Sequence, residues 1–275
     1  MSRRDGSESF YFFDFDDNIM HLETPIFLKN RTDGAEKAVS TTDFATIRGD
    51  LGRPGPWQDF EDYEKSYRRY YDIPAAEVAK GRKQYFVEDV EKALQDPAGK
   101  WQAPAWPLLV YACEKQRPVA LVTARGHGRE TIRAGVSVLV ERGFLPREPI
   151  YLEVFAVNNP GMVDELLSGI PDAAERDRLR AMEDRTAALK RVAIRAIVDK
   201  AVETYGAEPP HRFGMSDDDP ANVDLIIKAM CDCKQKFLDK RFFVINTHGG
   251  EHVKLEVFPV DFPVTRQADE GEPIG

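Results

Sequence analysis

The chain has 275 residues, of which 42% are hydrophobic and 31% are charged. This composition is typical of a globular protein and argues against a fibrous or largely disordered chain. The formal net charge of −9 argues against broad binding to nucleic acid, which needs clustered Lys and Arg to neutralise phosphates.

The first predicted strand covers the aromatic run at residues 10–13, and Asp14, Asp16 and Asn18 follow it at once. Four consecutive aromatic residues are typical of a short strand that is buried on both faces. Residues two apart on an extended chain lie on the same side, so Asp14 and Asp16 could both reach one metal ion or one phosphoryl group. A second interpretation stays open, because Asp-rich stretches after strands often form only turns or helix caps.

Residues 21–103 fit a core poorly, and we interpret them as an insertion. They contain predicted helical patches at 59–71 and 75–94, together with a loop at 49–56 that is rich in Gly and Pro. We therefore expect the core to comprise residues 1–20 and 104–260. A polar tail at 261–275 is expected to be mobile.

After the insertion, strand and helix patterns alternate along the chain. Helices are predicted at 106–116, 130–142, 172–182, 184–205 and 224–237, and strands at 118–123, 150–157, 211–216, 241–246 and 253–258. The last two strands are expected to pair as a hairpin. The alternation predicts an α/β fold with a doubly wound, parallel, Rossmann-like sheet.

Polar residues stand at the ends of three predicted strands. Asp14 and Asp16 follow the first strand, Thr123 ends the strand at 118–123, and Asp217 with Asp218 follows the strand at 211–216. In a parallel sheet these ends share one edge, where open α/β sheets bind ligands. Lys190 lies in the helix before the last of these strands, so a cation can reach the same edge.

This set of groups suits phosphoryl transfer. A phosphate ester repels a carboxylate, so a hard divalent ion such as Mg²⁺ and a lysine must neutralise the ester before attack. Asp14 would attack phosphorus to form an aspartyl-phosphate. Asp16 would protonate the leaving oxygen and later deprotonate water.

The same residues resemble the motifs of the haloacid dehalogenase superfamily of phosphohydrolases. In the superfamily, a hydrophobic strand is followed by Asp-x-Asp, which Asp14 and Asp16 match, and a second strand ends in Thr or Ser, which Thr123 matches. A lysine, matched by Lys190, precedes a strand that is followed by an acidic pair, matched by Asp217 and Asp218. Lys200 is the second candidate for this lysine, in reserve if Lys190 does not reach the site. The resemblance covers residues 10–222 without the insertions, and it implies that 21–103 is a cap region over the site.

The resemblance implies roles for individual residues. The catalytic set would be Asp14, Asp16, Thr123 and Lys190, and the Mg²⁺ ligands would come from Asp14, Asp16, Asp217 and Asp218. Either Asp217 or Asp218 binds the metal directly, or Asp218 acts with Asn222 at a wider spacing. Asp219, which precedes a proline, is expected to cap a helix.

Several residues are candidate substrate contacts. Asn18 stands where threonine is frequent in the superfamily, and its amide could donate to phosphate or cap the loop. Asp17 occupies a position where glycine is common in the superfamily. Arg125 directly follows the second motif and is the better placed cation, while His127, Arg48 and Arg53 are weaker candidates.

Asp16 also bears on the reaction class, because dehalogenases and phosphonate-cleaving members of the superfamily lack it. We therefore expect a Mg²⁺-dependent phosphohydrolase that acts on a small phosphorylated metabolite. A phosphotransferase or phosphomutase is the alternative enzyme, and a binding protein that retains the fold without turnover is the alternative outside enzymes. Substrate identity and oligomeric state stay open.

Cysteine usage and hydropathy bear on the compartment. The three cysteines, Cys113, Cys231 and Cys233, do not have the spacing of a disulfide framework. The chain contains no run of 18 successive apolar residues. We expect a soluble, cytoplasmic protein without a membrane partner.

Overall fold

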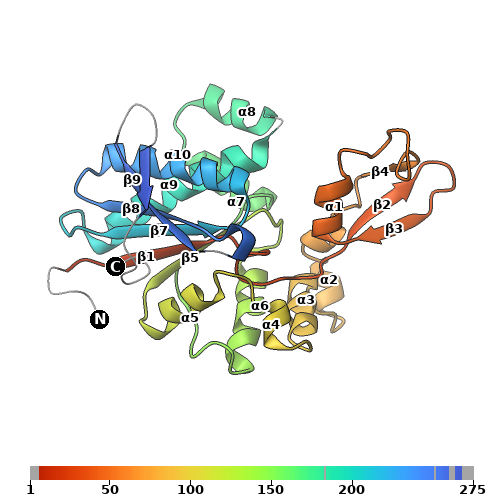
Figure 1. Cartoon of the computed structure of the whole chain (residues 1–275), viewed down its shortest axis with the longest axis horizontal. Helices are drawn as coiled ribbons and strands as arrows, with labels where there is room; N and C mark the ends of the chain where they lie inside the picture. The colour runs from red at the N-terminus through yellow and green to blue at the C-terminus, as the bar shows by residue number, and fades with distance from the viewer. Residues whose placement is uncertain (1–5, 183, 251, 260–263, 268–275) are drawn as a thin grey trace.

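The computed structural model describes residues 6–182, 184–250, 252–259 and 264–267. These residues form one large sheet with helices on both faces and one small sheet that lies apart from it (Figure 1). None of the helices in this described part is long and apolar enough to cross a membrane.

The strand β1 (Ser9–Phe13) lies in the middle of the large sheet. All five of its residues are buried, which explains why this strand is almost entirely aromatic. It pairs in parallel with β5 (Pro118–Thr123) on one side and with β7 (Arg212–Asp217) on the other. The carboxyl ends of these three strands therefore lie at one edge, as the sequence predicts.

Four further strands complete the order β10-β9-β8-β7-β1-β5-β6. Parallel pairing adds β6 (Ile150–Ala156) to β5 and β8 (Arg241–Asn246) to β7. The expected hairpin is confirmed, because β9 (Val253–Phe258) pairs antiparallel with β8. The strand β10 (Val264–Gln267), which lies within the tail expected to be mobile, pairs antiparallel with β9. Residues 260–263 and 268–275 lie outside the described part.

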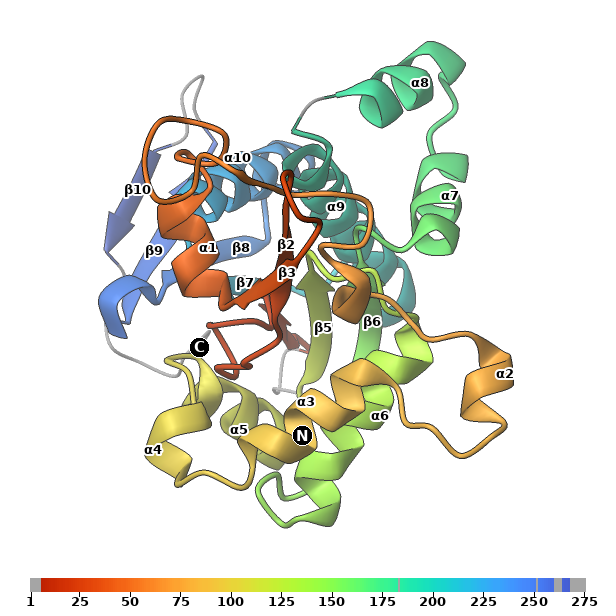
Figure 2. The same cartoon turned by 90° about the vertical axis from the view of Figure 1, so that its right-hand side faces the viewer.

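Helices cover both faces of the large sheet (Figures 1 and 2), so the expected α/β fold is confirmed, with a sheet that is mostly rather than wholly parallel. The helices on one side are α7 (Pro160–Ser168), α8 (Ala173–Ala181), α9 (Arg185–Tyr205) and α10 (Pro220–Lys236). The helices on the other side are α3 (Tyr85–Ala93), α4 (Ala98–Trp101), α5 (Trp106–Glu114) and α6 (Arg129–Glu141). Local signals set the ends of these helices. Gly206, at φ 98°, ends α9, and Asp219 caps α10 while Pro220 occupies its first turn.

The segment expected to be an insertion, residues 21–103, departs from its predicted secondary structure. Its elements are β2 (Ile26–Asn30), β3 (Glu36–Val39), α1 (Thr41–Ile47), β4 (Phe60–Glu61), the 3₁₀ turn η1 (Arg68–Tyr70) and α2 (Ala75–Val78). The predicted helix at 59–71 is wrong, because the segment holds only β4 and η1. The predicted helix at 75–94 is divided into α2 and α3, with Gly81 at φ 88° between them.

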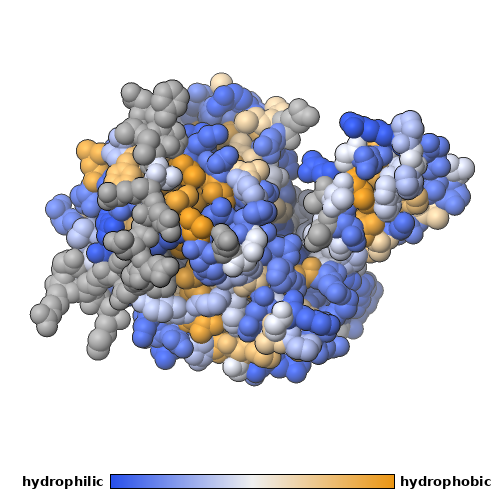
Figure 3. Space-filling model, viewed as in Figure 1, coloured by the Kyte–Doolittle hydropathy of each residue, from blue (hydrophilic) through white to orange (hydrophobic). Residues whose placement is uncertain are grey.

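Two hydrophobic clusters divide the inserted region. The small sheet has its own cluster around Ile26, Leu28 and Val39, whereas Phe86 and Trp101 belong to the main core. We call residues 26–70 the small module. It stands beyond the carboxyl edge of the large sheet (Figure 1), and a notch separates it from the core on the face drawn in Figure 3.

Candidate active site

Asp14 is the first residue beyond β1, at the carboxyl edge of the large sheet. Its backbone N–H donates to the carbonyl oxygen of Ser216 in β7 at 3.1 Å. This bond continues the parallel ladder by one residue and fixes the start of the loop. The Asp14 residue is only 8% exposed, which is unusual for a carboxylate and requires nearby partners.

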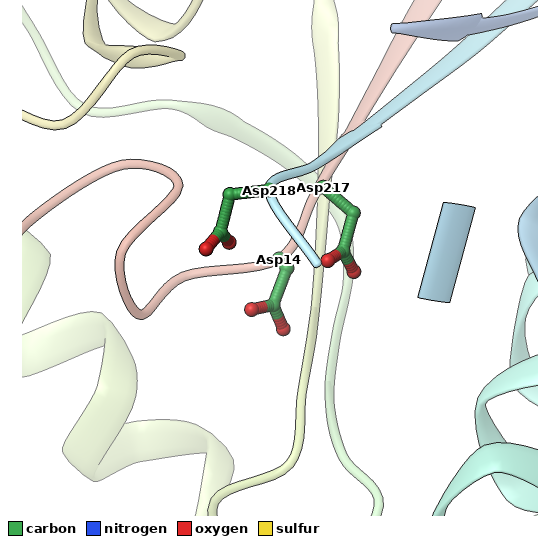
Figure 4. A group of neighbouring side chains, drawn as sticks. All are labelled: Asp14, Asp217 and Asp218. Carbon is green, nitrogen blue, oxygen red and sulfur yellow. The ribbon is translucent and has the colours of Figure 1, made fainter. Parts of the chain in front are cut away.

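Asp14, Asp217 and Asp218 form an acidic group at this edge. Each offers one carboxylate oxygen, and the three oxygens lie within 4.8 Å of one another. Figure 4 shows the three side chains gathered between the loop after β1 and the end of β7 (Figure 4). Hard carboxylate oxygens at this spacing fit a divalent cation such as Mg²⁺. Asp16, also expected among the ligands, does not belong to this group.

Lys190 is the cation of the site. It extends from α9, is 2% exposed, and its Nζ atom lies 3.0 Å from Asp14 Oδ1 and 3.4 Å from Asp217 Oδ2. Lys200, which is half exposed, instead pairs with Glu153. The structure therefore brings Lys190, and not the reserve lysine, to the acidic group.

Burial and mutual charge shift the pKa values of the site. Burial raises the pKa of Asp14 well above its ordinary value, Lys190 counteracts this rise, and Asp217 adds to it. Burial and the charge of Asp217 raise the pKa of Asp218 to about 7. Burial lowers the pKa of Lys190, but the nearby carboxylates together outweigh it, so that pKa lies above its ordinary value. Three carboxyl groups thus face a single ammonium, and a divalent cation would favour their charged forms.

The end of β7 is held by the start of α10. Asp217 Oδ1 accepts hydrogen bonds from the Asp219 N–H at 3.1 Å and from Asn222 Nδ2 at 3.2 Å. Asn222 therefore contacts Asp217 rather than Asp218. Asp219 accepts a hydrogen bond from the Ala221 N–H and caps α10, as the sequence predicts.

Asn18 holds the loop after β1 in place from inside. Its Nδ2 atom donates to the carbonyl oxygen of Asp14 at 3.0 Å and to the carbonyl and hydroxyl of Ser216 at 3.1 and 2.9 Å. Its Oδ1 atom accepts from the Thr247 hydroxyl at 2.9 Å. The buried amide thus joins the ends of β1, β7 and β8, and each of these contacts is with the protein. Asp17 next to it has φ 57°, a conformation that glycine adopts most readily and that Asp tolerates.

Thr123 and His127 are both buried beside the site. The Thr123 hydroxyl accepts a hydrogen bond from the Arg125 N–H at 3.2 Å, so it starts the turn after β5. Burial and the charge of Arg125 lower the pKa of His127 to about 3, so its ring is neutral at pH 7. The ring packs against Phe86.

Arg125 contacts Asp16 and not the acidic group. Its guanidinium donates from Nε to Asp16 Oδ2 at 2.8 Å and from Nη2 to Asp16 Oδ1 at 2.6 Å. Arg125 is 1% exposed, whereas the Asp16 side chain is 24% exposed. The remaining candidate arginines lie in the small module, where Arg48 lines a cavity of about 430 Å³ with Arg31 and Tyr67 and where Arg53 is exposed.

Sequence reasoning missed several residues that support the site. Thr247 directly follows the predicted strand at 241–246, so the rule about shared strand ends could have found it. Ser216 was seen only as the end of a strand. Thr24 and Tyr70, which contact each other and Arg125, carry no sequence signal because their positions depend on the path of the inserted region.

No model of a known protein family matches the chain, and neither does any curated protein or solved structure. The resemblance to the haloacid dehalogenase superfamily therefore depends on the motif residues themselves.

Proposed function

We propose that the chain is a Mg²⁺-dependent phosphohydrolase of the haloacid dehalogenase type. It would cleave phosphate monoesters of a small metabolite through an aspartyl-phosphate intermediate. The observation that carries this proposal is the assembly of Asp14, Lys190, Asp217 and Asp218 at the carboxyl edge of the sheet. Three carboxylates and one buried lysine offer both a cation site and a charged nucleophile in one place.

Asp14, Asp217 and Asp218 are the residues that would hold Mg²⁺. The ion would offset the negative charge of both the carboxylates and the phosphate ester when bound. The donor set fits this ion because all three side chains offer hard oxygen atoms and because one of them, Asp218, has a pKa raised to about 7 without a cation.

The chain's own residues then account for both halves of the reaction. A carboxylate oxygen of Asp14 attacks phosphorus, the phosphorus–ester oxygen bond breaks, and Asp16, once it has taken up a proton, gives that proton to the leaving oxygen. Asp16, now a carboxylate, takes a proton from water as that water attacks phosphorus. The bond between phosphorus and Asp14 breaks, so the products are an alcohol and inorganic phosphate, and both aspartates return to their first state.

We infer that the small module acts as a cap that encloses a small substrate. It stands beyond the sheet edge that carries the acidic group (Figure 1). Exclusion of bulk water by such a cap strengthens the electrostatic interactions inside a site.

Phosphate release from p-nitrophenyl phosphate and a panel of sugar, nucleotide and amino-acid phosphates, with and without Mg²⁺, tests the proposal. We expect Mg²⁺-dependent release that is lost in Asp14→Asn and retained in Lys200→Gln, a control at the surface lysine. Addition of candidate acceptor alcohols distinguishes hydrolysis from phosphoryl transfer. Activity that survives in Asp14→Asn, or no release from any ester, would contradict the proposal.

A further inference from the structure

We propose that Arg125 is a positioning residue for Asp16 and couples it to the segments by which the chain enters and leaves the small module. This inference rests on the proposed function, since Asp16 is there the acid and base. It assigns to Arg125 a task different from contact with the substrate.

The first observation is the geometry of the pair. The guanidinium meets both carboxylate oxygens of Asp16 with two roughly parallel bonds, of 2.8 and 2.6 Å. Two-point contacts of this kind fix the direction of a carboxylate as well as its distance. Asp16 is partly exposed, so without Arg125 its side chain would be free to adopt other rotamers.

The second observation is the environment of the guanidinium. The rings of Tyr70 and Phe86 each lie with their centroid 4.9 Å from the Arg125 Cζ atom. A buried cation must be paired, and Asp16 is the carboxylate that pairs with it. Nη1 of Arg125 is buried and has no hydrogen-bond partner among the described residues. The pairing with Asp16 is therefore its main electrostatic compensation.

The third observation ties the pair to the entry segment. Arg125 Nη2 also donates to the hydroxyl of Thr24 at 2.8 Å, just before β2 begins. The Thr24 hydroxyl in turn donates to Asp89 Oδ2 at 2.7 Å, and Arg69 contacts the other oxygen of Asp89. One chain of polar contacts thus runs from Asp16 through Arg125 to the start of the small module.

The exit segment is held to the same point. The Tyr70 hydroxyl donates to the Thr24 carbonyl at 3.1 Å, and the Tyr70 carbonyl accepts from the Gly126 N–H at 2.9 Å. Gly126 directly follows Arg125 in the chain. A shift of the small module would therefore move the surroundings of Arg125, and with them the carboxylate of Asp16.

A double-mutant cycle tests the positioning role. We expect Arg125→Gln to lower kcat by about 10²-fold, the cost of a catalytic group displaced by about an ångström, with KM close to the native value. In the Asp16→Asn background the same substitution should have no further effect on kcat, because the residue through which it acts is gone. Arg129→Gln, which removes another ion-paired arginine four positions further along the chain, is the matched control with native kcat.

Other results would overturn the inference. Equal losses in both backgrounds would show that Arg125 acts independently of Asp16, and a raised KM at native kcat would indicate direct contact with the phosphate. Circular dichroism of each variant checks the fold, and Arg125→Lys, which keeps the charge but not the two-point contact, should fall between native protein and Arg125→Gln. Native kcat in Arg125→Lys and Arg125→Gln would also contradict the role.

A measurement without turnover tests the coupling to the module and separates it from the proposed function. Hydrogen exchange of backbone amides at residues 22–24 and 70–72 should speed up in Arg125→Gln and Thr24→Val, and stay native in Arg129→Gln. Unchanged exchange in both of the first two variants would refute the coupling even if the enzyme is active. Absence of phosphatase activity together with faster exchange would refute the proposed function and leave the coupling standing.

Discussion

The Nζ atom of Lys190 lies 3.0 Å from the Oδ1 atom of Asp14, although 176 positions separate the two residues in the chain. The pair joins the longest helix, α9, to the central strand of the sheet at the point where both are buried. This contact shows that Lys190 is the lysine of the site. It also pairs the carboxylate of Asp14, in the loop after β1, with an opposite charge. It also makes the site dependent on the packing of α9.

Removal of the Lys190 ammonium should lower both the stability and the activity of the protein. Lys190→Gln leaves Asp14 and Asp217 buried without their cation, so we expect the metal-free protein at pH 7 to lose about 3 kcal/mol of unfolding free energy. Activity should fall to background. Urea denaturation measures the first and phosphate release the second. Lys200→Gln is the matched control, since Lys200 is half exposed and its partner Glu153 keeps its contact with Arg129, so the loss should be at most about 1 kcal/mol. Equal losses in the two variants would contradict the role of Lys190.

The pH dependence of stability should reveal the raised pKa of Asp218. Its pKa is about 7 in the folded protein against an ordinary value of 3.8. Between these values the folded state holds a proton that the unfolded chain has released, so this group stabilises the fold below about pH 4 and its contribution is lost as pH rises through about 7. Asp218→Asn should therefore stabilise the metal-free protein at pH 8 by about 2 kcal/mol, after allowance for partial exposure, and leave it unchanged at pH 3.5. Asp224→Asn, at an exposed acid in α10, should show no such difference in urea titrations.

Mg²⁺ should stabilise the native protein more at high pH than at low pH. Because carboxylates bind the ion only when they are deprotonated, we expect Mg²⁺ to raise the melting temperature of the native protein more at pH 8 than at pH 6. Asp218→Asn should reduce this gain, and EDTA should abolish it. Differential scanning calorimetry at both pH values makes the comparison, and a gain that is independent of pH would argue against Asp218 as a ligand.

Asn18 should be a stability determinant. Asn18→Ala removes four hydrogen bonds of the amide and leaves Ser216 and Thr247 with unmet groups, so we expect a loss of about 3 kcal/mol. Thr247→Val removes only one of these bonds and should cost about 1 kcal/mol. Urea denaturation of both variants tests this ranking. A substrate contact alone would instead raise KM in Asn18→Ala while stability stayed native.

Gly126 should tolerate no side chain. A Cβ atom there would lie 2.2 Å from Cε1 of Tyr71, well inside van der Waals contact. We expect Gly126→Ala to destabilise the protein by about 2 kcal/mol through this overlap. Tyr71→Ala in the same chain should recover part of the loss by removing the ring. Thermal melts of the two single variants and the double variant decide the matter, and simple addition of the two losses would exclude the overlap as the cause.

Much of the large sheet was predictable because its signals are local. The run at 10–13 is aromatic since the central strand is buried on both faces, and the helices show apolar periodicity where they cover the sheet. Acids and hydroxyls after strands marked one edge, which held for Asp14, Thr123, Asp217 and Asp218. The small module escaped prediction because β3 is largely exposed and β4 has only two residues, so neither has a hydrophobic pattern.

The sequence by itself determined the order of the strands and helices of the core and which polar residues follow the strands, because hydrophobic periodicity and turn chemistry act between near neighbours. Only the tertiary structure decided which partner each polar side chain meets. Lys190 rather than Lys200 reaches the acidic group, Asn18 turns toward Ser216, and Arg125 binds Asp16. Such pairings depend on how α9 packs and how the inserted region returns to the core, and the charge of a side chain does not specify them.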